Sequence, residues 1–314
     1  MQEKNQTLVS EIILLGFQNL QNIKIYSFSL FLLIYIITVC ENVLIIVLVS
    51  SSRNLQSPMY FFLQQLALSD LLQITNILPI LLQTIIYGRS TLSLVGCITQ
   101  LYFFGASEAC EFLLLSVMSF DRYVAIRIPL RYTSILNQRV CFILILMSWV
   151  LGFGIAVVTA NLIGALEFCD QNTINHFFCD FYPLLELSCS DTFSLQFEAF
   201  FLFVPMVFLP FILVIVSYVC IAHAILKIVS NTGRQKAFST CSSHMTVVSI
   251  FYGNIIAIYL FPPKKQSSTI NKVLSLLYTI VIPMVNPVIY SLRNKDIKEA
   301  LKVKVNEFCK SVNI

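Results

Sequence analysis

The sequence predicts an all-α membrane protein: a seven-transmembrane-helix bundle followed by a short amphipathic helix on the cytoplasmic side. Of its 314 residues, 57% are hydrophobic and 11% are charged, whereas a soluble domain carries about 25% charged residues. Mean hydropathy is +0.82. So much apolar surface needs lipid as its solvent. Apolar runs long enough to cross a bilayer lie at about 25–51, 59–86, 95–120, 140–166, 199–226, 243–262 and 273–292.

These runs divide the chain into three parts. We expect an N-terminal tail at 1–22, one membrane domain at 23–292, and a C-terminal amphipathic helix with its tail at 293–314. No joining segment resembles a soluble domain. The only apolar stretch in the tail, Ile12–Leu15, is too short for a cleavable signal and lacks a basic start. The first span must therefore set the orientation itself.

The basic residues predict which end of the bundle faces the cytosol. With the tail outside, six Lys and Arg residues lie on the outer side and fourteen on the inner side. Because Lys and Arg accumulate in cytoplasmic loops, we expect a plasma-membrane protein with its N-terminus outside and its C-terminus in the cytosol. Asn5-Gln6-Thr7 in the tail is a glycosylation sequon. It predicts a glycan on Asn5, against the alternative of a chance match.

The segment after the last span predicts contact with the membrane surface. Ile297, Leu301 and Val305 fall on one helical face, and Lys298 and Lys302 fall on another. Such a helix lies on the inner leaflet with lipid as its partner. The basic residues are not interleaved with aromatic residues on a soluble face, so we expect no nucleic-acid partner.

Four of the ten cysteines share the predicted outer side, namely Cys97, Cys169, Cys179 and Cys189. This placement indicates an oxidising compartment and two disulfides. The longest loop, about 167–198, holds three of them and no Lys or Arg. Its acidic residues are Glu167, Asp170, Asp180, Glu186 and Asp191, while Glu198 lies at the rim of the fifth span. Because loops of this length are usually functional, we expect it to cover a cavity.

The third span carries a polar stripe. At about 100° per residue, five later residues fall within about 40° of Cys97: Phe104, Glu108, Glu111, Leu115 and Arg122. A stripe this polar cannot face lipid, so this helix should lie at the centre of the bundle. Charges inside a span are costly and suggest function; the alternative is a pair of protonated, purely structural carboxyls.

The exit of the third span carries the most specific motif. Met118–Tyr132 reads Met-x-x-Asp-Arg-Tyr-Val-Ala-Ile-x-x-Pro-Leu-Arg-Tyr. Its Asp-Arg-Tyr resembles the signature of rhodopsin-like G-protein-coupled receptors, and the longer form resembles the vertebrate olfactory receptors. Further stretches with this resemblance are Pro58–Leu63, Ser217-Tyr218, Lys236–His244, Phe251–Gly253 and Pro283–Lys295. The resemblance therefore covers nearly the whole chain.

This resemblance implies an odorant receptor that activates a stimulatory G protein of the olfactory type and raises cAMP. It places the receptor in the ciliary membrane of olfactory neurons. It also implies disulfides Cys97–Cys179 and Cys169–Cys189. The residues that it assigns to activation and G-protein coupling are Asp121, Arg122, Tyr123, Tyr218, Lys236, His244, Asn286, Pro287 and Tyr290.

The resemblance also suggests a polar cluster in the interior. Asp70, Glu111 and Asn286 would together hold a sodium ion or share a proton, and no other cofactor is expected. The odorant pocket would lie in the outer half, between the third, fifth, sixth and seventh spans. Its matching positions are Phe104, Gly105, Glu108, Ala109, Leu202, Phe203, Met206, Tyr252, Ile255, Tyr259 and Thr279. Most are aromatic or aliphatic, as in small-molecule sites generally.

The charge of the ligand stays open at the sequence level. A cationic ligand would supply the partner that Glu108 lacks, because no Lys or Arg occurs in the nearby helix interiors. Phe104, Tyr252 and Tyr259 would add cation–π contacts. Alternatively, a protonated Glu108 donates a hydrogen bond to a neutral alcohol, ketone or ester.

Other functional classes fit the sequence less well. An enzyme is not expected: His176, His223 and His244 lack the spacing of a metal triad, and no phosphate loop or nucleophile elbow occurs. A channel or transporter could use the intramembrane acids as a path, but no internal repeat is evident and the inner rim is basic. A non-signalling scaffold leaves the Asp-Arg-Tyr and Asn-Pro-x-x-Tyr motifs without a role.

Overall fold

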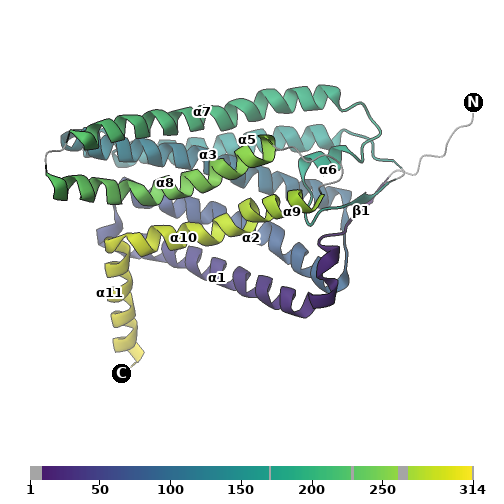
Figure 1. Cartoon of the computed structure of the whole chain (residues 1–314), viewed down its shortest axis with the longest axis horizontal. Helices are drawn as coiled ribbons and strands as arrows, with labels where there is room; N and C mark the ends of the chain where they lie inside the picture. The colour runs from purple at the N-terminus through teal and green to yellow at the C-terminus, as the bar shows by residue number, and fades with distance from the viewer. Residues whose placement is uncertain (1–8, 170, 228–229, 261–267, 313–314) are drawn as a thin grey trace, which may run out of the picture.

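Long helices lie side by side in a computed structural model that describes residues 9–169, 171–227, 230–260 and 268–312 (Figure 1). The final pass consists of α9 (Ser268–Leu276), the π-helical turn η4 (Leu277–Val281) and α10 (Ile282–Arg293). The preceding long helices are α1 (Lys24–Ser51), α2 (Pro58–Tyr87), α3 (Leu94–Arg127), α5 (Gln138–Gly164), α7 (Phe193–Leu226) and α8 (Asn231–Leu260). Together they form an all-α bundle, which confirms the predicted fold class.

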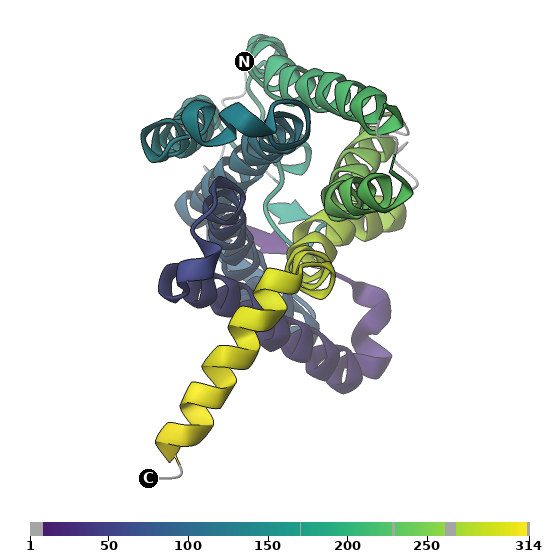
Figure 2. The same cartoon turned by 90° about the vertical axis from the view of Figure 1, so that its left-hand side faces the viewer.

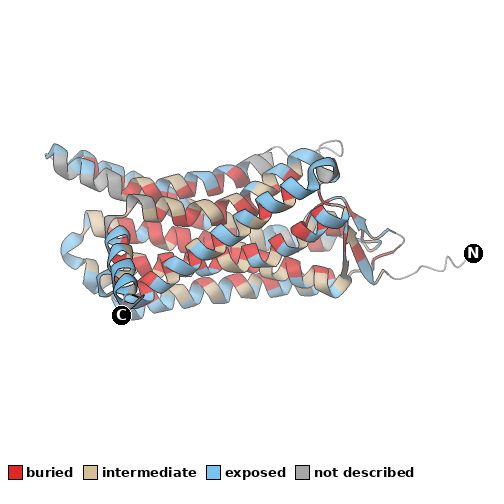
Figure 3. Ribbon diagram, turned by 90° about the horizontal axis from the view of Figure 1, so that it is seen from below, coloured by how far each residue is buried: buried red, intermediate tan, exposed pale blue. Residues whose placement is uncertain are grey.

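The helices have the length and surface of membrane spans. Six of them, within the described residues, are long and apolar enough to cross a bilayer. The 30-residue α8 completes the bundle and packs against α7 and α10. Large apolar side chains such as Phe142 and Leu209 point outward, each more than half exposed, while buried residues line the interior (Figure 3). Lipid is the solvent that suits this inverted surface.

α11 (Lys295–Val312) turns away from the bundle axis and crosses one end of it (Figures 1 and 2). Its first turns are anchored by Ile297 and Ala300, which are buried. The hydroxyl of Tyr60 on α2 donates a hydrogen bond to Asp296 at 2.7 Å. This is the amphipathic helix that the sequence predicts after the last span.

α3 is the central helix, as its polar stripe predicts. It packs against α2, α5 and α7. Along the stripe, Cys97, Glu111 and Arg122 are 0%, 1% and 9% exposed. Ser93 caps the first turn, where its hydroxyl accepts a hydrogen bond from the Gly96 N–H at 3.0 Å. The stripe is therefore buried at both ends of the helix, with Glu108 between them partly exposed.

The connections carry short elements. They are β1 (Glu11–Leu14), η1 (Gln18–Ile23), η2 (Arg53–Leu55), β2 (Ser90–Ser93), η3 (Pro129–Arg131), α4 (Tyr132–Ile135), β3 (Thr173–Ile174) and α6 (Phe181–Leu185). Disulfides join Cys97 to Cys179 and Cys169 to Cys189, the pairs that the family resemblance implies. We refer to this end of the bundle as the disulfide end and to the opposite one as the Arg122 end.

A three-stranded sheet covers the disulfide end, in the order β2-β1-β3. β1 pairs antiparallel with β2, Ile12 opposite Leu92, and parallel with β3, Ile13 opposite Thr173. The sequence predicts only a tail here. The tail folds because Ile12 and Leu14 alternate with more exposed neighbours and bury completely, which is the pattern of a half-buried strand.

Lys272 ties this sheet to the final pass. Its ammonium group donates hydrogen bonds of 2.6 Å to the Gly16 carbonyl and of 2.6 Å to Asn175 Oδ1. It also lies 5.9 Å from the centre of the Phe17 ring. Burial, together with the positive charge of Lys272, lowers the pKa of His176 to about 3. The imidazole is therefore neutral in the folded protein.

Replacing Lys272 with methionine should loosen this sheet, because two hydrogen bonds from a charged donor are lost. Each such bond contributes about 1.5–3 kcal/mol. In the purified variant, the backbone amide hydrogens of residues 11–16 should exchange roughly tenfold or more faster than in the unsubstituted protein. Lys302→Met, at an exposed position of α11, is the matched control. Unchanged exchange in Lys272→Met would show that β1 is held by the strand pairing alone.

Candidate functional site

Phe104 on α3 is the meeting point of three elements near the disulfide end. Its ring is 4% exposed. It packs edge-on against Phe178 of the long loop, with centroids 5.2 Å apart, and against Tyr278 of η4 at 5.7 Å. The loop, α3 and the final pass therefore share one aromatic contact at the depth where the sequence predicts the pocket.

The long loop is fixed directly onto α3. Besides the Cys97–Cys179 disulfide, the Cys179 N–H donates a 2.9 Å hydrogen bond to Gln100 Oε1. The next residue, Asp180, is thereby placed above Glu108, close enough for the two carboxyls to repel each other. The sequence analysis did not single out Asp180. The available signal was its position beside a cysteine that is bonded to the head of the third span.

Asp180 carries a perturbed carboxyl. Its Oδ1 accepts a 2.8 Å hydrogen bond from the Phe181 N–H at the start of α6. Burial nevertheless dominates and raises its pKa to about 6, from an ordinary value of 3.8. Near neutral pH the loop thus holds a negative charge against the bundle at an energetic cost.

A second aromatic group lies deeper, around Tyr252 of α8. Its ring centroid is 5.6 Å from that of Phe112 on α3 and 4.6 Å from that of Phe211 on α7. Phe112 is one turn below Glu108. The Tyr252 hydroxyl is buried and has no hydrogen-bond partner within the described residues. It is therefore a buried polar atom that no described residue satisfies.

The other predicted pocket residues vary in their placement. Ala109, Met206 and Ile255 are buried in the core, Leu202 is partly exposed, and Phe203 packs on Phe181 at 6.2 Å. Two positions turn away from the Phe104 and Tyr252 groups. A side chain at Gly105 would meet Ala156 of α5. The Thr279 hydroxyl donates a 2.7 Å hydrogen bond to the Ser275 carbonyl of the same final pass. Tyr259 lies in α8, but its side chain falls outside the described residues.

A cleft of about 220 Å³ opens between α3 and α5 near the disulfide end. Val95, Tyr102 and Asn161 are among the residues that line it, and none of the predicted ligand residues does. This cleft opens outward and is separate from the Phe104 and Tyr252 groups.

The predicted polar cluster forms in the bundle interior. Asn286 Nδ2 donates to both Asp70 carboxylate oxygens, at 3.1 and 3.2 Å. The Asp70 and Glu111 carboxyls lie within hydrogen-bonding reach of each other. Glu111 Oε1 is buried and lacks a partner within the described chain. Two carboxyls this close need either a shared proton or a cation.

At the Arg122 end, the arginine of the Asp-Arg-Tyr motif pairs with the adjacent aspartate. Arg122 Nε donates to Asp121 Oδ2 at 2.8 Å, and a second guanidinium nitrogen contacts the same oxygen. Tyr132 of α4 donates its hydroxyl to Asp121 Oδ1 at 2.6 Å. Both charges are thus satisfied within the bundle, so neither is presented to a partner.

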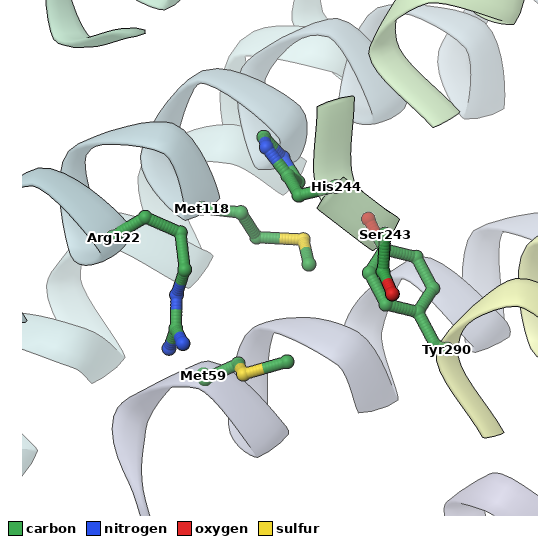
Figure 4. Close-up of a pocket in the computed structure, with 6 residues that line it drawn as sticks. All are labelled: Met59, Met118, Arg122, Ser243, His244 and Tyr290. Carbon is green, nitrogen blue, oxygen red and sulfur yellow. The ribbon is translucent and has the colours of Figure 1, made fainter. Parts of the chain in front are cut away.

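Side chains of α8 and α10 meet this motif. A small cleft of about 10 Å³ is lined by Met59, Met118, Arg122, Ser243, His244 and Tyr290 (Figure 4). The hydroxyl oxygen of Tyr218 on α7 lies 2.5 Å from His244 Nδ1, within hydrogen-bonding distance. The Tyr290 hydroxyl, on the same helix as Pro287, is buried without a partner within the described residues. Five helices, α2, α3, α7, α8 and α10, therefore converge on the residues that the family resemblance assigns to activation.

Three assigned positions contribute less to this picture. Tyr123 is partly exposed beside Phe120, with ring centroids 6.4 Å apart. Lys236 lies in α8, with its side chain outside the described residues, and Asn5 belongs to residues 1–8, which are also outside them.

Comparison with known proteins identifies the family of this bundle. A family model described as "Olfactory receptor" matches residues 31–307. The chain belongs to the olfactory receptor family. Human olfactory receptor 5G3 is 44% identical over 305 residues, covering 97% of each chain. Human olfactory receptor 11L1 is 42% identical over 309 residues, covering 98% of this chain and 96% of its own.

A rat relative gives the same result: olfactory receptor 1468 of Rattus norvegicus is 44% identical over 301 residues, with 96% of each chain covered. Proteins of this olfactory receptor family are G-protein-coupled receptors, not enzymes.

Asp180→Asn should stabilise the ligand-free olfactory receptor. The amide oxygen can keep the bond to the Phe181 N–H, while the unpaired charge disappears. Because the folded pKa lies above the unfolded one, the cost of about 1–3 kcal/mol is complete above pH 6 and is lost between about pH 6 and 4. Thermal unfolding should show a higher midpoint for the variant at pH 7.5 and equal midpoints near pH 4. Equal midpoints at pH 7.5 would contradict a buried charge here.

Proposed function

We propose that this olfactory receptor binds a small odorant near the disulfide end, between α3, α7, α8 and η4. Binding favours a conformation in which α7 and α8 open at the Arg122 end. A stimulatory G protein of the olfactory type then docks there, and cAMP rises. The observation that carries the proposal is the hydrogen-bonded Asp121–Arg122 pair at one end of α3. The same helix contributes to the aromatic groups around Phe104 and Tyr252 nearer its other end.

α3 provides the mechanical link between these ends. From Cys97 to Arg122 it rises about 37 Å at 1.5 Å per residue, so an odorant at Phe104 cannot touch Arg122. A ligand shifts the equilibrium only by binding one conformation more tightly than the other. Phe112 of α3 contacts both Phe251 and Tyr252 of α8, at 4.9 and 5.6 Å. A ligand that displaces these rings changes the packing of α8 against α3.

The orientation proposed is the one that the sequence predicts. Disulfides persist in oxidising compartments, so the disulfide end faces outward and the Arg122 end faces the cytosol. Olfactory receptors are membrane proteins of sensory cells, which supports a place in the plasma membrane, specifically the ciliary membrane of olfactory neurons. The basic inner rim agrees with this orientation.

Arg122→Ala should remove the cAMP response and leave odorant binding and surface expression largely intact. In the proposed mechanism the Arg122 guanidinium separates from Asp121 and contacts the G protein. It lies too far from the odorant to affect odorant binding. A cAMP assay over a broad odorant panel, with surface labelling, measures this. Arg139→Ala, an exposed arginine at the start of α5, is the control. A full response from well-expressed Arg122→Ala receptors would refute the coupling role.

For the interior cluster we propose that Asp70 and Glu111 share a proton, which a sodium ion can replace. Oxygen-rich sites suit hard cations, and the unpartnered Glu111 Oε1 supplies an available ligand. The fit is incomplete, because Asn286 directs its amide nitrogen, not its oxygen, at Asp70. Within the described residues, no cluster of three acidic, His or Cys side chains forms a metal site.

This exchange predicts a dependence of stability on sodium. Replacing NaCl by the chloride of N-methylglucamine should lower the thermal midpoint of the wild-type receptor, since a ligand that binds only the folded state stabilises it. Asp70→Asn should abolish the difference. An equal sodium effect in both proteins would place the ion elsewhere, and no effect in wild type would leave the shared proton as the only occupant.

A further inference from the structure

The acidic side chains near the disulfide end have no cationic partner within the described residues. The described residues form two ion pairs, Arg122–Asp121 and Lys304–Glu307, and neither involves an acidic side chain of the disulfide end. The buried Lys272 is bonded to Gly16 and Asn175 instead. The carboxyl of Glu108 makes no hydrogen bond to any described residue, and Asp180 has only the Phe181 N–H at its Oδ1.

The two carboxyls belong to elements that meet at Phe104, whose ring packs on Phe178 of the loop. The loop is pinned to α3 at Gln100 by the Cys179 N–H and at Phe104 by Phe178. Glu108 is the next residue below Phe104 on the same face, one turn deeper. The Asp180 carboxyl of the loop and the Glu108 carboxyl of the helix are close enough to interact electrostatically.

Two buried side-chain oxygens deeper in the bundle also lack hydrogen-bond partners within the described residues. Tyr252 is 3% exposed and Glu111 1% exposed. Each has an oxygen without a hydrogen-bond partner within the described part of the chain. Phe112, which packs on Tyr252, lies one turn from Glu108. Buried polar oxygens normally find partners. Glu111 belongs to the interior cluster with Asp70, so the Tyr252 hydroxyl is the buried polar atom near Glu108 that is left for a ligand.

We propose that the preferred odorants of this receptor are aliphatic amines, with the ammonium group held between Glu108 and Asp180. This inference rests on the proposed function and names the ligand class of the same site. An ammonium group has three donors and no acceptor, which matches a site rich in carboxylate oxygens. The face of Phe104 adds a cation–π contact.

The surroundings favour a cation over the other two classes. An alcohol gains a hydrogen bond from one carboxyl but leaves the repulsion between the two in place. A carboxylic acid adds a third negative charge. The described part of the loop also carries Glu167, Asp180, Glu186 and Asp191 and no Lys or Arg, and such a one-sided charge concentrates cations at the entrance.

The test uses full-length receptor in cells that report cAMP. Several carbon skeletons are each presented as a primary amine, an alcohol and a carboxylic acid to wild type, Glu108→Gln and Asp180→Asn. We expect wild type to respond best to amines. Each variant should lower amine potency by about tenfold or more, as expected for the loss of a charge-assisted hydrogen bond, and leave alcohol potency unchanged. Glu186→Gln, an exposed acid of the same loop, is the matched control.

Glu108→Asp guards against a misfolded variant, because it keeps the charge and should retain the preference for amines. Surface labelling of an N-terminal tag normalises all variants. Amine potency that is unchanged in both neutral variants overturns the inference. A wild type that answers alcohols and ignores amines also overturns it, while the proposed function stands. A surface-expressed receptor that answers no compound class overturns both.

Discussion

The structure depends on keeping the polar groups of α3 out of lipid. A charged group facing hydrocarbon costs several kcal/mol, so the stripe from Cys97 to Arg122 forces α3 into the middle of the bundle. Its neighbours α2, α5 and α7 pack around it, and their outward faces become the lipid surface. One helix thereby carries Cys97 of the disulfide, Glu108, Glu111 of the interior cluster, and Arg122 of the Asp-Arg-Tyr motif.

Each charge along that helix is handled differently. Arg122 is paired with its neighbour Asp121, which Tyr132 holds in turn. Glu111 shares its environment with Asp70, which Asn286 binds. Glu108 and Asp180 have no comparable arrangement among the described residues. A buried group left unsatisfied in this way is costly, and such strain is tolerated where a ligand relieves it.

The sheet and the long loop that cover the disulfide end also fix the position of Asp180. β1 lies between β2 and β3, so the N-terminal segment, the α2–α3 connection and the long loop form one sheet. Lys272 links that sheet to α9, and two disulfides fix the loop. This rigidity holds Asp180 over Glu108. The disulfide end is therefore covered by paired strands and by a loop that two disulfides hold.

The sequence alone determined the helical bundle, the family resemblance and the central place of α3. These follow from local patterns: apolar runs of membrane length, one polar stripe at helical spacing, and the motif that begins at Met118. It also singled out Asp70, Glu111 and Asn286, which meet in the structure. Only the tertiary structure turned the tail into β1, because strand pairing joins segments about 80 and 160 residues apart. It likewise set Gly105 against α5, and brought Asp180 and Lys272 to their partners. Periodicity reports which residues share a face of one helix, whereas contacts between a loop and a helix depend on how distant parts of the chain pack together.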